Sequence, residues 1–350
     1  MTQAVDAPPV SSTLIRARLS RRSLAVIAVG VIAATAVLFA VTPLQGRAGF
    51  VLVAAGLYVV TQTVVSSLVE GRRRAKDRLI SSIVVACAGA AVLPLAAVLG
   101  FTVAKGTVVL SGSFLTHTMR GVAEQDADGG IYHAIIGTLE QVSLATVMAV
   151  PFGLLVAIYL VEYSSGRLGR VVSFFVDVMT GLPSIVAGLF IFALWILGLG
   201  QSFSGFAGSL ALAILMLPTV VRSAEEMLKI VPDGLREGSY ALGVRKWVTV
   251  VRIVLPAALA GIVTGVMLAV ARVTGETAPL LLTVFGNPGL NFNPFSGPQA
   301  SLSLFVFSEA GLPNDTAIDR AWAAALVLIL IVVILTISAR VVSRFASVRS

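Results

Sequence analysis

Residues 254–285 read VLPAALAGIVTGVMLAVARVTGETAPLLLTVF, and this stretch decides the fold class. It is apolar for long enough to cross a bilayer as a helix, because about 20 residues at a rise of 1.5 Å each span a hydrocarbon core of about 30 Å. Arg272 and Glu276 lie near its midpoint. An intramembrane charge that faces lipid costs about 2.5 to 3.5 kcal/mol. We therefore expect both side chains to face protein, water or a substrate.

The same stretch contains residues that interrupt a helix, Gly275 and Pro279. A helix broken within the membrane leaves backbone N–H groups unpaired, and such groups bind an anion where they line a cavity. The planar guanidinium of an arginine beside the break matches the geometry of an oxyanion. The pattern predicts an anion site, with a closed Arg272–Glu276 ion pair that only joins helices as the alternative.

The composition of the whole chain supports a membrane protein. Its 350 residues are 57% hydrophobic and only 12% charged, with a mean hydropathy of +0.98, whereas about a quarter of the residues in a soluble domain are charged. A single cysteine, Cys87, excludes a disulfide framework, and two histidines leave little for a zinc site or histidine catalysis.

Eight apolar stretches are predicted to span the membrane, which makes the chain an all-α polytopic protein. They cover residues 24–41, 50–69, 80–104, 135–161, 171–199, 206–221, 254–285 and 322–339. Gly261 and Gly265, surrounded by alanines, predict close helix packing in the seventh span. The longest outer loop, 286–321, ends in an apolar patch, SLSLFVF, for which a re-entrant or docking element and an interfacial helix on lipid are both open.

The basic residues set the orientation of the spans. Of 25 lysines and arginines, 20 lie on the side of the two termini, while Arg47, Lys105, Arg120 and Arg320 lie opposite and Arg272 lies within a span. The positive-inside rule then places both termini in the cytoplasm. The net charge of +8 serves topology and contact with anionic lipid, so nucleic acid is excluded as a partner.

The main cytoplasmic segment, 222–252, overlaps the sequence SAEEMLKIVPDGLREGSYALGVRKWVTVVRIVLP at 223–256. Its spacing, with Glu237 six residues before Gly243 and then Ile253, Leu255 and Pro256, resembles the EAA loop of ABC importer permeases. The triplet here is Glu237, Gly238, Ser239, so the two alanines of the family pattern are missing. The resemblance implies a short helix and a glycine turn that a separate ATPase grips. A solvated amphipathic connector is the alternative.

Three further motifs narrow the resemblance. GTL at 137–139, PSIV at 183–186 and RVTGETAP at 272–279 occur in this order around the EAA-like spacing. Together they resemble the PstA-type permeases of phosphate-specific ABC importers, across roughly residues 80–340. The residues assigned to a substrate pathway are Arg272, Glu276, Thr274, Thr277, Arg222 and Ser184, and those assigned to ATPase coupling are Glu237, Gly238, Ser239, Gly243 and Pro256.

The resemblance implies a type I ABC importer fold, here a six-helix core at 80–341 preceded by a tail (1–23) and two additional spans with a basic loop (24–79), and followed by a tail (342–350). It also implies a plasma-membrane complex with a second related permease, two copies of a cytoplasmic ATPase that carries ATP and Mg²⁺, and an external phosphate-binding protein. The chain lacks a GxxxxGK[ST] phosphate loop, so we expect no ATP hydrolysis and no cofactor in it.

Phosphate import is therefore the leading prediction. An ABC permease for molybdate or sulfate and a gradient-driven secondary transporter, in which Glu276 carries a proton, are the alternatives.

Overall fold

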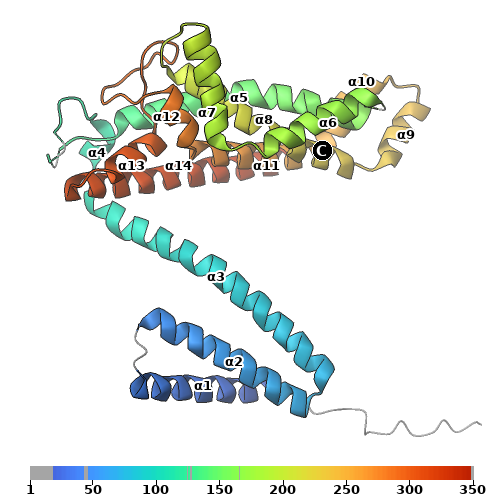
Figure 1. The fold of residues 1–350 in the computed structure, drawn as a ribbon. Helices are drawn as coiled ribbons and strands as arrows, with labels where there is room; N and C mark the ends of the chain where they lie inside the picture. The colour runs from blue at the N-terminus through green and yellow to red at the C-terminus, as the bar shows by residue number, and fades with distance from the viewer. Residues whose placement is uncertain (1–18, 43–45, 124, 127, 165, 348–350) are drawn as a thin grey trace, which may run out of the picture. The chain divides into compact units, whose positions relative to one another are not determined.

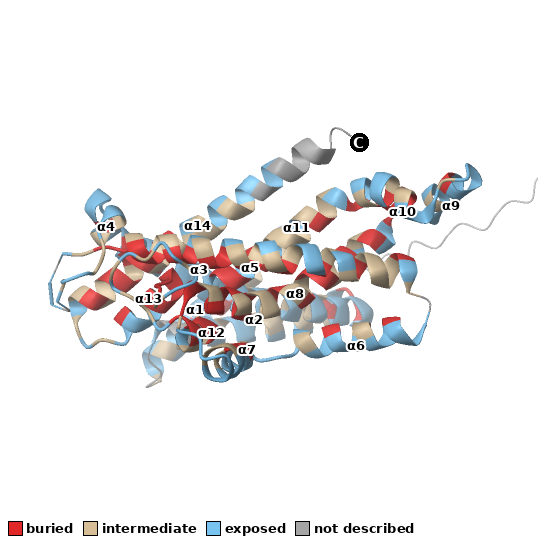
Figure 2. Ribbon diagram, turned by 90° about the horizontal axis from the view of Figure 1, so that it is seen from above, coloured by how far each residue is buried: buried red, intermediate tan, exposed pale blue. Residues whose placement is uncertain are grey.

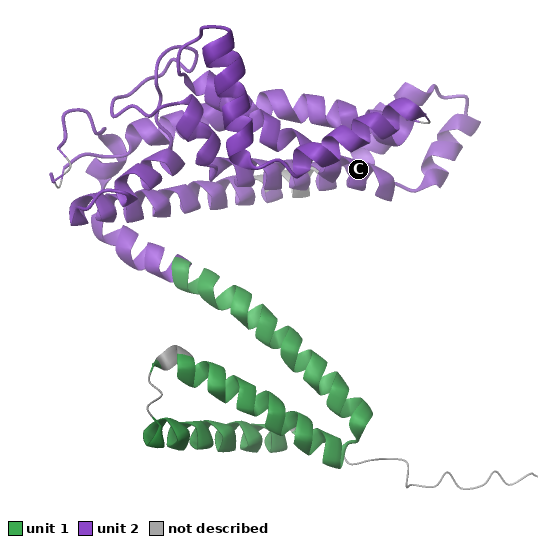
Figure 3. Ribbon diagram, viewed as in Figure 1, with its two compact units in different colours: residues 1–98 green, residues 99–350 purple. Residues whose placement is uncertain are grey.

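The computed structural model describes residues 19–42, 46–123, 125–126, 128–164 and 166–347 (Figure 1). Within them the regular structure is helical. The chain divides into two compact units, residues 1–98 and 99–350 (Figure 3). The division falls inside one long helix, α3 (Arg72–Val109). The sequence prediction placed the start of the core at residue 80.

Unit 1 contains α1 (Arg21–Val41), α2 (Arg47–Val69) and the first part of α3. The Ser20 hydroxyl oxygen accepts a hydrogen bond from the Ser23 backbone N–H and so caps the N-terminus of α1. Glu70 follows α2 directly, and Gly71, at a φ of +94°, makes the turn into α3.

Unit 2 holds the remaining helices. They are α4 (Gly112–Thr116), α5 (Tyr132–Ile158), η2 (Tyr159–Tyr163), α6 (Arg167–Thr180), α7 (Ser184–Ile191), η3 (Phe192–Gly198), α8 (Gly205–Ile230), α9 (Asp233–Ala241), α10 (Lys246–Thr249), η4 (Val250–Val254), α11 (Leu255–Thr274), α12 (Ala278–Thr283), α13 (Leu302–Ala310) and α14 (Asp315–Ser347). The three η segments are π-helical continuations of α5, α7 and α10.

The elements of unit 2 gather at two opposite ends. Helices α9 and α10 lie at one end, which we call the coupling end (Figures 1 and 2). The short helix α4, α13 and the long loops lie at the other, which we call the loop end. Helix α14 begins at the loop end and runs toward the coupling end. The long helices of the bundle run between these two ends (Figure 1).

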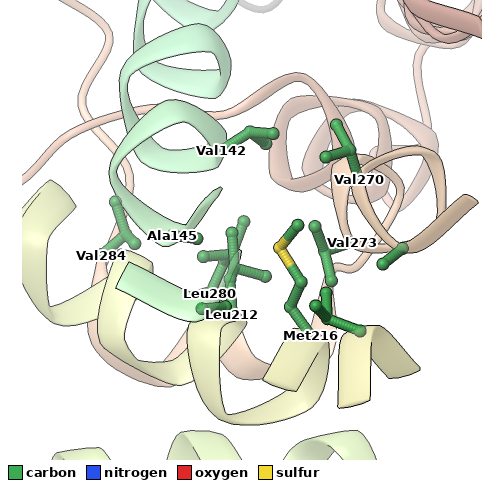
Figure 4. Close-up of a cluster of buried hydrophobic side chains, with 11 residues drawn as sticks. Val142, Ala145, Leu212, Met216, Val270, Val273, Leu280 and Val284 are labelled. Atoms are coloured by element: carbon green, nitrogen blue, oxygen red, sulfur yellow. The ribbon is translucent and has the colours of Figure 1, made fainter. Parts of the chain in front are cut away.

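The core of this bundle lies where α5, α8, α11 and α12 meet (Figure 4). The cluster consists of Val142, Ala145, Ala149, Leu212, Met216, Val220, Ala269, Val270, Val273, Leu280 and Val284. Two glycines allow α11 to approach α8 closely. A Cβ atom on Gly265 would lie 2.4 Å from the Ser223 Cβ, and one on Gly261 would lie 2.2 Å from the Met227 sulfur. The predicted role of this glycine pair in helix packing is confirmed.

Among the described residues, seven helices are long and apolar enough to span a membrane, and an eighth span results if the pair Arg167–Thr180 and Ser184–Gly198 is counted as one. That pair bends by 105° between its parts, so the fifth predicted span, 171–199, is not one continuous helix. Its break lies at Gly181, Leu182 and Pro183, where the Pro183 ring and the restricted residue before it oppose a continuous helix.

Two other sequence expectations are revised by the helix boundaries. The sixth span does not end at Val221, because α8 continues to Ile230 with Ala224 and Leu228 buried. The apolar patch SLSLFVF forms α13, which packs against α14 and α5 and buries Leu302, Leu304 and Phe305. It is therefore part of the protein core at the loop end.

Candidate functional site

The seventh predicted span breaks where the sequence indicated. Helix α11 ends at Thr274, and α12 begins at Ala278 after three residues. The N–H groups of Gly275 and Glu276 donate to the carbonyls of Arg272 and Val273 at 3.3 and 3.2 Å. The Ser303 hydroxyl of α13 donates to the Glu276 carbonyl at 2.8 Å. Among the described residues, the N–H groups of Thr277 and Ala278 have no partner, so they are the free donors at the break.

Arg272 points away from the core of its own chain. It lies in the last turn of α11, where Val270, Val273 and Thr274 are buried on the opposite side. The exposed positions of this helix include Thr264, Leu268 and Arg272, which are spaced four residues apart and so share one face. A membrane-embedded arginine on such a face requires a polar pathway or a partner protein beside it.

Arg272 and Glu276 do not form an ion pair in this structure. No described side chain lies within hydrogen-bonding or salt-bridge distance of either charged group. Residues four apart share a face only on a continuous helix, and here the helix ends at Thr274, between the two. The guanidinium and carboxylate are thus both free to contact another group.

The residues next to Arg272 show where it lies along the axis of the bundle. Thr274 and Val270 surround a cavity together with Thr138 and Val142, which lie in the Tyr132 half of the continuous helix Tyr132–Tyr163. The helix that carries Arg272 runs from Lys246 to Thr274. Arg272 therefore lies toward the loop end of the helix Lys246–Thr274, and its expected position near the middle of the apolar stretch 254–285 stays a prediction.

The two threonines of the predicted pathway have different surroundings. Thr274 is 2% exposed, and its hydroxyl donates to the Val270 carbonyl at 2.7 Å. Its side chain thus belongs to the core rather than to the face that carries Arg272. Thr277 is half-buried and precedes α12, beside the free N–H groups of the break.

Ser184 is the first residue of α7, immediately after the break in the fifth span. Helix α7 packs against α12, and a Cβ atom on Gly188 would lie 2.7 Å from the Pro279 Cα. The fold thus brings together the helices that begin at the PSIV and GETAP motifs. Two broken spans, far apart in the sequence, meet at the loop side of the core.

Arg222 is fully engaged within the bundle. Its guanidinium donates to the hydroxyl and carbonyl of Ser173 at 2.9 and 3.0 Å and forms ion pairs with Asp177 and Glu225. Lys229 also pairs with Glu225, at 2.7 Å. Arg222 therefore joins α8 to α6 in this structure, and a contact with substrate would require it to exchange these partners.

The predicted coupling segment forms a short helix with a glycine turn. Helix α9 ends at Ala241, and Gly243 has a φ of +74°, the left-handed conformation expected for it. The Gly243 N–H donates to the Tyr240 carbonyl and the Val244 N–H to the Ser239 carbonyl, which is the Schellman arrangement. The turn exposes Leu242, whose exposed fraction is 84%.

The surroundings of the EAA-like triplet explain its departure from the family pattern. Glu237 and Gly238 are exposed, but Ser239 is 5% exposed. The Ser239 hydroxyl shares a 2.8 Å hydrogen bond with the hydroxyl of buried Thr249 on α10. Serine is tolerated at the last alanine position because its polar group has a partner across the turn. Pro256 lies further along, in the first turn of α11.

Arg236 was not identified from the sequence, yet it connects the coupling helix to two spans. Its guanidinium pairs with Glu162 of η2 at 2.9 Å and donates to the carbonyls of Leu228 and Val231 at 2.9 and 2.6 Å. The Glu162 side chain is 4% exposed. Arg236 precedes Glu237 of the motif, but no local pattern indicates a partner 74 residues away.

The comparisons with known proteins agree with this arrangement. The family model of the binding-protein-dependent transport system inner membrane component matches residues 149–348. The chain is 48% identical over 279 residues to the phosphate transport system permease protein PstA 1 of Mycobacterium tuberculosis (strain CDC 1551 / Oshkosh), which covers 79% of this chain and 91% of that protein. It is 38% identical over 240 residues to PstA of Pasteurella multocida (strain Pm70), covering 68% and 84%.

Among solved structures, an inward-facing form of the MetNI methionine ABC transporter shares the fold. The TM-score is 0.52 at 18% identity, and the match covers 68% of this chain and 99% of that chain. Fold and family match together define a membrane permease subunit of the binding-protein-dependent class. Within that class, the chain belongs to the PstA-type permeases.

Proposed function

We propose that this chain is the membrane-spanning permease subunit of an ATP-driven inorganic phosphate importer and forms half of the translocation pathway. The observation that carries the proposal is the 48% identity to the Mycobacterium tuberculosis phosphate permease over 91% of that protein. A match of this extent includes the broken spans and the coupling segment together. The geometry of the two sites supports the same function.

The anion path centres on the break between α11 and α12. Arg272 supplies a permanent positive charge on an exposed helix face, and the N–H groups of Thr277 and Ala278 add neutral donors. Glu276 accepts a hydrogen bond from the P–OH group that phosphate still carries near neutral pH and that sulfate lacks. In this arrangement a second, related permease supplies the opposite wall of the pathway, and Thr277 and Ser184 lie at its margin.

The coupling end transmits the movement of an ATPase. The exposed side chains of Leu242 and Glu237 form a knob that a groove of the ATPase holds, while Arg236 fixes the knob to η2 and the end of α8. Closure of two ATPase subunits around ATP and Mg²⁺ then displaces the long helices as rigid bodies. The chemistry of hydrolysis belongs to that partner, and this chain transmits its result.

The orientation follows from the distribution of basic residues. The coupling end, with α9 and α10, faces the cytoplasm, and the loop end faces an external phosphate-binding protein. Both termini then lie in the cytoplasm of a cell whose plasma membrane holds the complex.

Uptake measurements in cells that lack this chain test the function. We expect radiolabelled phosphate uptake to fall and to return when the gene is restored, while sulfate and molybdate uptake stay unchanged. A loss of molybdate or sulfate uptake with normal phosphate uptake would assign another oxyanion. Purification of the chain without any ATPase, together with transport that persists after ATP depletion, would indicate a gradient-driven transporter instead.

A further inference from the structure

Unit 1 contains an open cavity with both polar and apolar walls, and its lining residues lie outside the matched family region of residues 149–348. The cavity has a volume of about 790 Å³, and residues of α2, α3 and the segment before α1 line it. This volume lies within the range of small-ligand pockets, about 300 to 1,000 Å³. All of its lining residues belong to unit 1, and none of them is among the residues assigned to the substrate pathway or to ATPase coupling.

The wall of the cavity at the turn between α2 and α3 contains a closed ion pair. Glu70 accepts hydrogen bonds from Arg78 at 2.7 and 2.9 Å, from the Ser66 hydroxyl at 2.8 Å and from the Leu19 N–H at 2.9 Å. The Arg78 guanidinium holds the pKa of the Glu70 carboxyl well below its usual range, at about 2. The two charges thus neutralise each other and leave the remaining arginines of this turn to bind a ligand.

Free positive charge surrounds the same turn. Arg72, Arg73, Arg74 and Lys76 are exposed and have no carboxylate partner among the described residues, and Asp77 is the single unpaired acid beside them. Of the four cations, only Arg74 lines the cavity, and Asp77 lines it as well. The turn at residues 70–78 as a whole holds five basic residues against two acidic ones, so its net charge is positive. An anionic group is the ligand that this balance of charge favours.

Deeper in the cavity, a buried amide lacks a partner. Gln62 of α2 lines the cavity and is 7% exposed, and its side chain has no hydrogen bond within the described part of the chain. Tyr58, Ser81 and Ser82 add further hydroxyl groups to the lining. The amide atoms of Gln62 remain accessible from the cavity, so a polar ligand group at this depth can form hydrogen bonds with them.

The remaining walls are apolar. Ala55 and Val59 of α2 face the cavity together with Val85 and Ala86 of α3. A ligand that satisfies the whole lining has an anionic head, hydrogen-bonding groups one or two helical turns below it, and a hydrocarbon part. A phospholipid has these three parts in this order, whereas free phosphate or a nucleotide lacks the hydrocarbon part.

We infer that this cavity binds one anionic phospholipid of the cytoplasmic leaflet, with the phosphate at Arg74, the glycerol ester groups near Gln62 and an acyl chain between α2 and α3. The inference concerns unit 1 alone and does not depend on the transported substrate. Positively charged pockets between helices on the cytoplasmic side of a membrane recognise lipid head groups in this way.

Lipid competition at a reporter in the cavity tests the inference on the full chain. Tyr58→Trp, combined with phenylalanine at Trp195, Trp247 and Trp322, places a single fluorophore in the lining. The protein is reconstituted in brominated phosphatidylcholine, which quenches tryptophan. Unbrominated phosphatidylglycerol should restore the fluorescence at a low mole fraction, and unbrominated phosphatidylcholine should not.

Substitutions at two neighbouring arginines distinguish a lipid bound at one site from a general electrostatic attraction of anionic lipids to the basic turn. One basic residue near an anionic surface contributes about fivefold to lipid affinity wherever it lies. Direct contact with a phosphate adds about tenfold more. Arg73→Gln should therefore weaken phosphatidylglycerol about fivefold, and Arg74→Gln about tenfold beyond that. Arg74→Lys, which keeps the charge, should lie between the two, and Gln62→Leu should lower the affinity without changing the salt dependence.

Three results would overturn the inference. Equal losses in Arg73→Gln and Arg74→Gln would show diffuse attraction without a site. Equal binding of phosphatidylcholine and phosphatidylglycerol would remove the requirement for an anionic head. An absence of quenching in every lipid, reversed by deletion of residues 1–18, would show that the N-terminal segment of the chain fills the cavity.

Discussion

The proposed role of Arg272 depends on where its helix ends. Glu276 is the fourth residue after Arg272, and an unbroken helix would have placed the two side chains on one face, within reach of each other. The end of α11 at Thr274 separates the two side chains, so each remains available to a substrate. The cost of an unpaired arginine in the membrane is accepted only where it faces a polar pathway.

A double substitution distinguishes a substrate contact from a structural ion pair. If Arg272 only neutralises Glu276, then Arg272→Met with Glu276→Gln should recover much of the about 3 to 5 kcal/mol lost when a single partner is removed. Because the two groups are not paired here, we expect the double variant to assemble and hydrolyse ATP while phosphate uptake remains lost. Recovery of uptake in the double variant would instead identify the pair as structural.

A double-mutant cycle tests how much the hydrogen bond between Ser239 and Thr249 contributes to stability. Removal of one buried hydroxyl leaves the other with one partner fewer, at about 1 to 3 kcal/mol. Ser239→Ala and Thr249→Val should each lower the midpoint temperature of unfolding of the purified complex, and the double variant should lose less than the sum of the two. Additive losses would mean that the hydrogen bond contributes nothing to stability.

At the scale of elements, glycines decide how the chain turns and how closely helices approach. Gly243→Val places a β-branched residue at a φ of +74°, which costs about 1 to 2 kcal/mol or more and distorts the end of α9. We expect phosphate uptake and co-purification of the ATPase to fall together. Gly234→Val in the same helix is the control, since an added Cβ there meets no atom within 4 Å. Normal uptake in Gly243→Val would remove α9 from the coupling mechanism.

The contact between the two broken spans allows a sharper test. Gly188→Ala inserts a methyl group 2.7 Å from the Pro279 Cα, a backbone atom with no side-chain freedom to move. Overpacking of this kind costs about 1 to 3 kcal/mol and should displace α12 from α7. We expect transport to fall while ATPase binding at the far end of unit 2 is kept. Gly181→Ala, whose nearest contact is 3.6 Å, should behave as the wild type, and equal behaviour of both variants would contradict the close contact.

The sequence predicts features that depend on local residues, and it does not predict features that depend on how distant helices pack. Glycine and proline act locally, so the break at Gly275 and the turn at Gly243 were predicted correctly. The bend of 105° near Pro183 was not, since hydropathy is the same for a straight and a folded apolar stretch. Arg236 and Glu162 also stayed hidden, because their pairing depends on how distant helices pack and on no local spacing.

At the scale of the molecule, the proposed substrate site and the proposed coupling site lie at different levels of unit 2. Helix α12 lies toward the loop end and α9 lies at the coupling end (Figures 1 and 2). Arg272 is in the last turn of α11, directly before the break that leads into α12. The helices α8 and α11 continue between the ends and pack closely through Gly261 and Gly265. A close-packed interior resists deformation, so displacement at one end is carried to the other as a rigid-body movement.

This separation requires the two ends to face opposite sides of the membrane, which accessibility labelling tests. With Cys87 replaced by alanine, single cysteines are introduced at Ser296 in the loop 286–301 and at Leu242 on α9, both of which are exposed. A membrane-impermeant maleimide added to intact cells should label Ser296→Cys and leave Leu242→Cys unlabelled until the membrane is permeabilised. The charge distribution motivates this expectation, with 20 of 25 basic residues on the side of α9. Labelling of Leu242→Cys alone in intact cells would invert the topology, and it would remove both the cytoplasmic ATPase and the external binding protein from their proposed faces.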